Sequence, residues 1–228
     1  MSQNTQAAAA TKSKFSVRDI CYAGLFAAVI AVMAQLSIPM PLGVPMTMQT
    51  FAITLAAVVL GSKLSAIATL VYLALGAVGV PVLANFQGGP SAIFGKTGGY
   101  ILGYILCALI VGALSRKFAF NFKTLCLSMV LGVAVCYAFG TIWFMAVTGL
   151  NLATSMSYCV IPFLPGDAVK ILLAAFLALR LLEVGVHFPD VQLHLLQRFG
   201  YFFHLQLGRC EDNDAFGRLL GEKTADDS

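Results

Sequence analysis

Residues 163–184 read FLPGDAVKILLAAFLALRLLEV, a long apolar run that carries one carboxylate and one amine near its start. The run has about the 20 residues that a helix needs to cross roughly 30 Å of hydrocarbon. Asp167 is the only acidic residue between Asp19 and Glu183, and Lys170 follows it after three positions. Because an ionisable group in a membrane segment is costly unless it is paired or faces a polar cavity, the pair predicts a buried site.

The composition is that of an integral membrane protein. The 228 residues are 59% hydrophobic and 11% charged, with a mean hydropathy of +0.88, whereas soluble domains carry about 25% charged residues. The net charge of +4 is accounted for by basic residues beside the apolar runs, so nucleic-acid binding is not expected. We expect an all-α membrane protein with one membrane domain.

Six apolar runs are predicted to be membrane helices. The second is shorter than the others, and we expect it to be buried among its neighbours. The six runs lie at 20–38, 48–61, 64–80, 98–115, 125–147 and 163–184. The membrane domain is therefore expected at 20–184, between an N-terminal tail at 1–19 and a C-terminal tail at 185–228. An amphipathic stretch near 191–207 in that second tail is typical of a helix on the inner leaflet.

The distribution of Lys and Arg predicts the orientation, because short cytoplasmic loops retain these residues. One side of the predicted bundle holds Lys12, Lys14, Arg18, Lys63, Arg116, Lys117, Lys123 and Arg180. The connections on the other side, at 39–47, 81–97 and 148–162, hold only Lys96. Both termini are therefore expected to be cytoplasmic, in a multi-pass protein of the cell membrane.

Two connections on the outer side have an unusual composition. Residues 37–50 read SIPMPLGVPMTMQT, and residues 79–100 read GVPVLANFQGGPSAIFGKTGGY. In the first, three prolines and a glycine prevent regular helix, while Thr47, Gln49 and Thr50 offer hydrogen-bonding groups. The second is too rich in glycine and proline for a helix and too apolar for a solvated loop. Non-helical backbone at membrane depth is tolerated where it is buried or lines a cavity, so these loops predict a capped pocket. The alternative is a tightly packed turn whose glycines only permit bends.

The spacing of Asp167 and Lys170 places both on one face of the last helix, within reach of each other and of a ligand. The alternative is that Asp167 caps the start of that helix while the Lys170 side chain extends toward the membrane surface.

Several stretches, in order and spacing, resemble the BioY family, the biotin-binding S component of energy-coupling-factor (ECF) transporters. They are YAGLFAAVIAVMA, IPMPLGVPMTMQTF, GSKLSAIATLVYLALGAVGVPVLANFQGGPSAIFGKTGGYILGY and FLPGDAVKILLAAFLA, and the similarity covers residues 18–182. The resemblance implies six helices with both termini inside, a pocket near the outer surface, and docking to a membrane coupling subunit, the T component, driven by two cytosolic ATPases. The sequence itself has no G-x-x-x-x-G-K-[ST] phosphate loop.

The resemblance also implies site residues. Asp167 and Lys170 match the polar pair of the family at the start of the sixth helix, and Asn85 matches a third polar position in the loop after the third helix. The chemistry suits biotin, whose ureido ring has two N–H donors and one carbonyl acceptor. Gln49 and Tyr100 are further candidates for ligand contact.

Other residues near the predicted pocket have two readings. Phe86, Phe139 and Trp143 are expected either to enclose the apolar part of the ligand or simply to pack or anchor at the membrane interface. Lys96 is expected either to attract the ligand carboxylate or to be a solvated loop lysine.

Ala23, Ala27 and Ala31 recur every four residues in the first predicted helix. Small residues at this spacing let another helix approach closely. In S components such a strip docks the coupling subunit, which is what the resemblance implies here. Packing within the chain is the alternative.

No cofactor, metal site or catalytic residue is expected. The cysteines have no C-x-x-C spacing, and all three histidines, His187, His194 and His204, follow the last apolar run. A solitary carrier of biotin that works without ATPases and a carrier of another small vitamin are the alternative functions. An intramembrane enzyme fits poorly, because the membrane domain has neither a histidine nor a second acid to act with Asp167.

Overall fold

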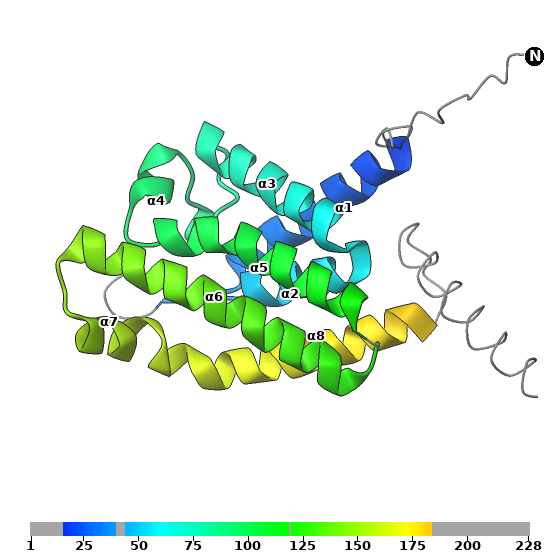
Figure 1. Ribbon diagram of the computed structural model, residues 1–228. Helices are drawn as coiled ribbons and strands as arrows, with labels where there is room; N and C mark the ends of the chain where they lie inside the picture. Colours follow the sequence, from blue (N-terminus) through cyan, green and yellow to red (C-terminus); the bar gives the residue numbers. More distant parts are fainter. Residues whose placement is uncertain (1–15, 40–43, 119, 184–228) are drawn as a thin grey trace, which may run out of the picture.

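The chain is almost entirely helical in the computed structural model, which describes residues 16–39, 44–118 and 120–183. The helices and strands are α1 (Val17–Gln35), β1 (Ser37–Ile38), β2 (Met46–Thr47), α2 (Gln49–Leu60), α3 (Ser62–Val78), η2 (Ala84–Phe86), α4 (Pro90–Phe94), α5 (Gly98–Lys117), α6 (Phe122–Thr148), α7 (Leu152–Cys159), η3 (Ile161–Phe163) and α8 (Leu164–Glu183). The long helices form a bundle, and the short helices α4 and α7 lie at the same end of it (Figure 1). The expected helical class is confirmed.

Among the described residues, four helical stretches are long and apolar enough to cross a membrane: α1, α5, α6 and the run Leu152–Glu183 that contains α8. The apolar helices α2 and α3 are shorter. Each of the six predicted spans begins and ends within three residues of one of these helices. That all six cross the bilayer, with both termini inside, stays a prediction.

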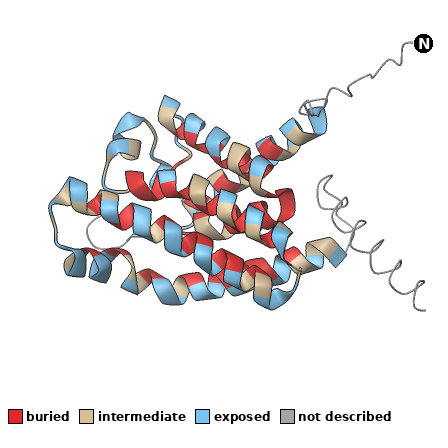
Figure 2. Cartoon of the chain, in the orientation of Figure 1, coloured by how far each residue is buried: buried red, intermediate tan, exposed pale blue. Residues whose placement is uncertain are grey.

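Helix α2 is the centre of the bundle. Nearly all of its residues are buried, and it packs against α1, α3, α5 and α8 (Figure 2). Its 12 residues are too few to cover the hydrocarbon core, so burial against protein on all sides explains how an apolar helix of this length is accommodated.

Glycines allow α5 and α6 to pack closely, which makes this the most extensive contact between two helices. A Cβ at Gly99 would collide with Trp143, and one at Gly140 would collide with the ring of Tyr100. Small residues at a helix interface permit this close approach in a membrane protein. The packing fixes the position of Tyr100.

The connection between α3 and α5 folds back against the bundle, as its composition predicts. The side chain of Leu83 is buried at 3% exposure and lies over Gly76, where a Cβ would meet it. The Gly89 N–H donates to the Gly76 carbonyl at 2.7 Å. The expectation that this segment lacks helix is wrong, because the short helices η2 and α4 form here. Helix α4 begins at Pro90, whose fixed φ suits the first turn of a helix.

Two further elements were not expected from the sequence. Helix α7 lies in the region expected to be a loop, and its start is capped by Asn151, whose Oδ1 accepts from the Thr154 N–H at 2.9 Å. Strands β1 and β2 form a two-residue antiparallel pair in which Ser37 is opposite Thr47. The predicted amphipathic stretch at 191–207 lies outside the described residues.

Candidate functional site

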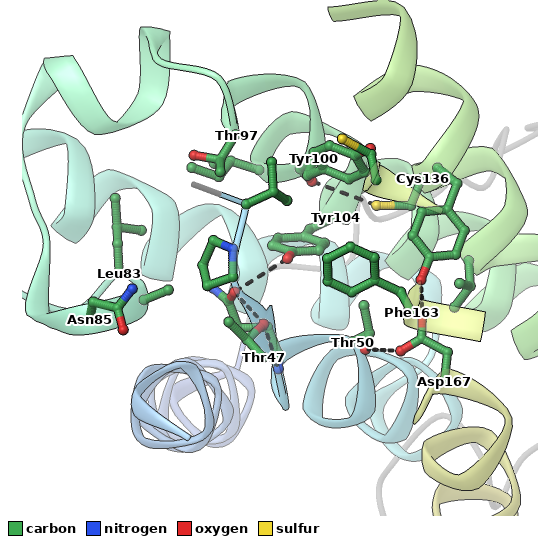
Figure 3. Close-up of a pocket in the computed structure, with 18 of the residues that line it drawn as sticks. Thr47, Thr50, Leu83, Asn85, Thr97, Tyr100, Tyr104, Cys136, Phe163 and Asp167 are labelled. Atoms are coloured by element: carbon green, nitrogen blue, oxygen red, sulfur yellow. Dashed lines mark hydrogen bonds between the residues drawn. The ribbon is translucent and has the colours of Figure 1, made fainter. Parts of the chain in front are cut away.

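A cavity lies where the folded-back loops meet the ends of the helices. It holds about 880 Å³ of space not filled by protein, counting its open mouth. Its lining residues come from β2, α2, the η2 segment, α4, α5, α6, α7, η3 and α8, and they include Thr47, Thr50, Leu83, Asn85, Thr97, Tyr100, Tyr104, Tyr137, Phe163, Asp167 and Lys170. Figure 3 shows many of these side chains around the same space. The predicted pocket is therefore present, and the alternative of a packed turn is wrong.

Asp167 and Lys170 form a buried ion pair in the wall of this cavity. The Lys170 Nζ lies 2.8 Å from the Asp167 Oδ1, and the two residues are only 7% and 5% exposed. The Lys170 Nζ also donates to the carbonyl oxygen of Thr47 at 2.7 Å. The alternative that Lys170 extends toward the membrane surface is therefore wrong.

The carboxylate of Asp167 is surrounded by donors from three helices. The Tyr137 hydroxyl donates to Oδ2, and the Thr50 hydroxyl donates to Oδ1 at 3.4 Å (Figure 3). With Lys170, these groups stabilise the negative charge by charge-assisted hydrogen bonds. Within the described part of the chain the partners of Asp167 are side chains, not backbone N–H groups of the first turn of α8, so the helix-cap alternative is not what forms.

Gln49 belongs to a second polar cluster at the start of α2. Its Oε1 accepts from the Thr47 hydroxyl at 2.8 Å and from the Tyr104 hydroxyl at 3.2 Å, and its Nε2 donates to the Tyr72 hydroxyl. Gln49 is 4% exposed. The amide lines the cavity, as expected, but most of its hydrogen-bonding capacity is used within the protein.

Asn85 lines the same cavity from the opposite side. In Figure 3 it lies beside Leu83, and Thr47 and Tyr104 lie between it and Asp167. Its Oδ1 accepts from the Ser37 hydroxyl at 2.6 Å, and the amide lies at the exposed mouth of the cavity. The three residues matched to the family thus share one cavity, but the structure separates Asn85 from the Asp167–Lys170 pair.

Tyr100 lies in the wall formed by α5. It is 7% exposed, its hydroxyl lies 3.3 Å from that of Thr141, and its ring meets the ring of Tyr137 edge-on at a centroid distance of 6.3 Å. Edge-to-face contacts of this kind hold two rings in a fixed relative orientation. Tyr100 therefore helps to hold Tyr137 beside Asp167.

The weaker candidates lie outside the cavity wall. Phe86 is 72% exposed and Phe139 is 43% exposed, and Lys96 is exposed. Trp143 packs on Gly99 and donates from its Nε1 to the Gly95 carbonyl at 3.1 Å. Since none of the four is among the lining residues found in the described part of the chain, packing and anchoring explain them better than ligand contact.

Sequence reasoning missed much of the wall, including three of its aromatic residues. Tyr104 and Tyr137 place hydroxyl groups among the polar clusters, and Phe163 lines the cavity from η3. A tyrosine inside an apolar span can be used to predict a polar site, because its hydroxyl needs a hydrogen-bond partner when it is buried.

The alanine strip of α1 packs against the bundle, while a neighbouring face of the same helix is exposed. Ala23 and Ala27 are buried at 5% and 3% exposure, and Ala31 is partly buried. On the neighbouring face Gly24 and Ala28 are exposed. Packing within the chain therefore occupies Ala23 and Ala27, and docking of a partner along α1 stays a prediction.

The side chains that line the cavity suit the binding of a small molecule. In the described ranges, no group of three His, Cys, Asp or Glu side chains is placed to hold a metal ion. What the cavity offers is one carboxylate, one amine, amides and hydroxyl groups among aromatic walls, a combination that recognises a small molecule with both polar and apolar parts.

The fold and the site define a helical membrane protein that encloses a small-molecule binding pocket. A profile of the BioY family matches residues 5–185, and the chain belongs to that family. It is 40% identical over 171 residues to "Biotin transporter BioY" of Thermotoga maritima, covering 75% of this chain and 99% of the relative. It is 37% identical to "Probable biotin transporter BioY" of Pyrococcus horikoshii, covering 72% and 96%.

A solved structure has the same fold. It is titled "Crystal structure at 2.1 A of the S-component for biotin from an ECF-type ABC transporter", with a TM-score of 0.68, 28% identity, and coverage of 73% of this chain and 92% of that one. The resemblance inferred from the sequence is confirmed. Since the relatives are named as transporters, the expectation of a transporter rather than an enzyme is also confirmed.

Proposed function

We propose that this chain is the biotin-binding membrane subunit of an ECF transporter. It captures biotin from outside the cell and delivers it inward together with a membrane coupling subunit and two cytosolic ATPases. In this proposal the protein lies in the cell membrane, six helices cross the bilayer, both termini are cytoplasmic, and the cavity opens outward. The names of the relatives and of the similar structure support biotin as the ligand.

The buried Asp167–Lys170 pair in the cavity wall is the observation that carries the proposal. A carboxylate accepts from the N–H groups of a ureido ring. An ammonium group has three N–H donors, and Lys170 directs two of them to Asp167 and Thr47 among the described residues. The third is available to the ureido carbonyl oxygen, so the pair can meet both polar edges of the ring.

The rest of the cavity suits the apolar parts of biotin. Aromatic rings of Tyr100, Tyr104 and Phe163 line it, and aromatic walls bind a sulfur-containing ring and a short alkyl chain by burying their apolar surface. The polar group of Asn85 at the opposite side gives the ligand a second point of attachment.

Binding of labelled biotin to the detergent-purified protein tests this function. We expect saturable binding by the wild type and a loss of at least about 100-fold in affinity for Asp167→Asn, because the variant removes a buried charge-assisted acceptor. The matched control is Glu183→Gln, which changes the same kind of group at a side chain that is 64% exposed. Wild-type protein without affinity for biotin contradicts the proposal, and unchanged affinity in Asp167→Asn contradicts the assignment of the site.

A further inference from the structure

The segment that carries Asn85 has an unusual backbone conformation. Asn85 and Phe86 have φ angles of +58° and +56°, in the left-handed region. Asparagine tolerates this region, but a residue as bulky as phenylalanine rarely adopts it. Two such residues in succession persist only where surrounding contacts hold them.

Two backbone hydrogen bonds close the turn, from the Leu83 N–H to the Gln87 carbonyl at 3.0 Å and from the Gln87 N–H to the Ala84 carbonyl at 3.3 Å, and the Ser37 hydroxyl donates to the Asn85 Oδ1. The remaining side-chain contacts to the backbone of this turn come from Gln35, the last residue of α1. Its Nε2 lies 3.1 Å from the carbonyl oxygens of both Val82 and Leu83. Its Oε1 accepts from the Phe86 N–H at 2.9 Å. A single amide therefore binds the backbone on both sides of Asn85.

The Gln35 side chain is itself held in place. Its Nε2 is 3.2 Å from the carbonyl oxygen of Ala31, one turn earlier in α1. Gln35 lies behind the cavity wall, since the wall residues of the described segments include Leu83, Ala84 and Asn85 but not Gln35. Its contacts reach the ligand site only through the loop.

We infer that Gln35 is a positioning residue for ligand capture, which holds the backbone of residues 82–86, with its two left-handed residues Asn85 and Phe86, and thereby places Asn85 at the cavity mouth. The inference rests on the proposed function, because the ligand is biotin in both. A preformed loop does not have to be ordered when the ligand binds, so the ordering cost of binding is lower. Loss of the Gln35 amide raises that cost and shortens the residence time of the ligand.

The test compares Gln35→Met with Leu36→Met in detergent-purified protein. The first variant keeps the length of the side chain and removes its hydrogen bonds; the second introduces the same residue at the exposed neighbouring position (57% exposed). We expect Gln35→Met to weaken biotin binding by about tenfold, mostly through faster dissociation, and Leu36→Met to bind as the wild type does. Equal binding by Gln35→Met and wild type overturns the inference.

A double-mutant cycle separates positioning from general stability. In the Asn85→Gly background, which removes the amide and accepts a positive φ, Gln35→Met is expected to weaken binding by less than about twofold, because the group that it positions is gone. The same tenfold loss in both backgrounds shows that Gln35 does not act through Asn85 and overturns the inference.

Hydrogen exchange gives a readout that needs no ligand. We expect the backbone amides of residues 82–88 to exchange faster in Gln35→Met than in wild type, with the amides of α5 unchanged. If wild-type protein fails to bind biotin, the proposed function fails, whereas the exchange measurement still decides whether Gln35 holds the segment. Unchanged exchange there overturns the inference.

Discussion

The Nζ of Lys170 lies 2.7 Å from the carbonyl oxygen of Thr47 and connects α8 to the strand that leads into α2. The same amine is paired with Asp167, so one side chain joins the ion pair to the strand β2 that precedes the central helix α2. A ligand that contacts Lys170 therefore acts on two segments that are more than a hundred residues apart in the sequence.

The first prediction concerns the stability of the ion pair. Lys170→Met leaves the Asp167 carboxylate buried without its cation, and we expect this to lower the free energy of unfolding by about 3 kcal/mol. The double variant Asp167→Asn/Lys170→Met is expected to recover most of that loss, because no unpaired charge remains. Thermal unfolding in detergent measures both.

The control for that prediction is Arg180→Met. Arg180 and Glu183 form a pair with the same i, i+3 spacing at 3.0 Å, but both side chains are more than half exposed. Exposed pairs contribute little, so we expect a change within about 0.5 kcal/mol. Equal effects of Lys170→Met and Arg180→Met show that burial of the Asp167–Lys170 pair is energetically unimportant.

The second prediction concerns the hydrogen bond from Tyr137 to Asp167. Tyr137→Phe keeps the ring against Tyr100 and removes only the hydroxyl, so we expect biotin affinity to fall by about tenfold and the unfolding temperature to fall as well, because the buried carboxylate loses one hydrogen-bond partner. Tyr158→Phe is the matched control, since Tyr158 is 40% exposed. Titration with labelled biotin measures both variants, and identical affinities rule out a role of Tyr137 in orienting the carboxylate.

The third prediction concerns the close packing of α5 on α6. A Cβ at Gly140 collides with the ring of Tyr100, so Gly140→Ala is expected to destabilise the protein by about 2 kcal/mol and to weaken binding by displacing that ring. Gly24→Ala is the matched control, because its Cβ meets no atom within 4 Å. There the same substitution should stabilise the helix by about 0.5 kcal/mol. Equal unfolding temperatures for the two variants contradict the packing argument.

The fourth prediction concerns the face of α1 that meets a partner. Because Ala27 is buried and Ala28 is exposed, we expect Ala27→Trp to disrupt the bundle and Ala28→Trp to leave biotin affinity within about twofold of wild type. In cells that also supply the coupling module, Ala28→Trp should lower ATP-driven biotin uptake by blocking close approach of another helix.

Leu172→Trp is the control for that experiment, since it places the same bulk on an exposed position of α8 (51% exposed). It is expected to leave uptake unchanged. Normal uptake by Ala28→Trp shows that the exposed face of α1 is not where the coupling subunit docks.

The positions of the helices follow from hydropathy, because apolar runs of membrane length have few other stable conformations. The Asp167–Lys170 pair was found in the sequence for a related reason: charges are rare inside such runs. Tyr104 and Tyr137 were missed because a tyrosine in an apolar helix has the same local pattern whether it faces lipid or a cavity. The burial of Ala23 and Ala27 depends on which neighbour packs against α1, and one sequence does not contain that information.

The short length of the central helix sets the depth of the binding site. Twelve residues rise about 18 Å, against a hydrocarbon thickness of about 30 Å. Gln49 lines the cavity and is the first residue of α2, so in the proposed membrane placement the hydrocarbon layer extends beyond it on the side of the loops. In the proposed orientation, a bound molecule is therefore already partway through the membrane, and the path that remains to the cytosol is about the length of one short helix.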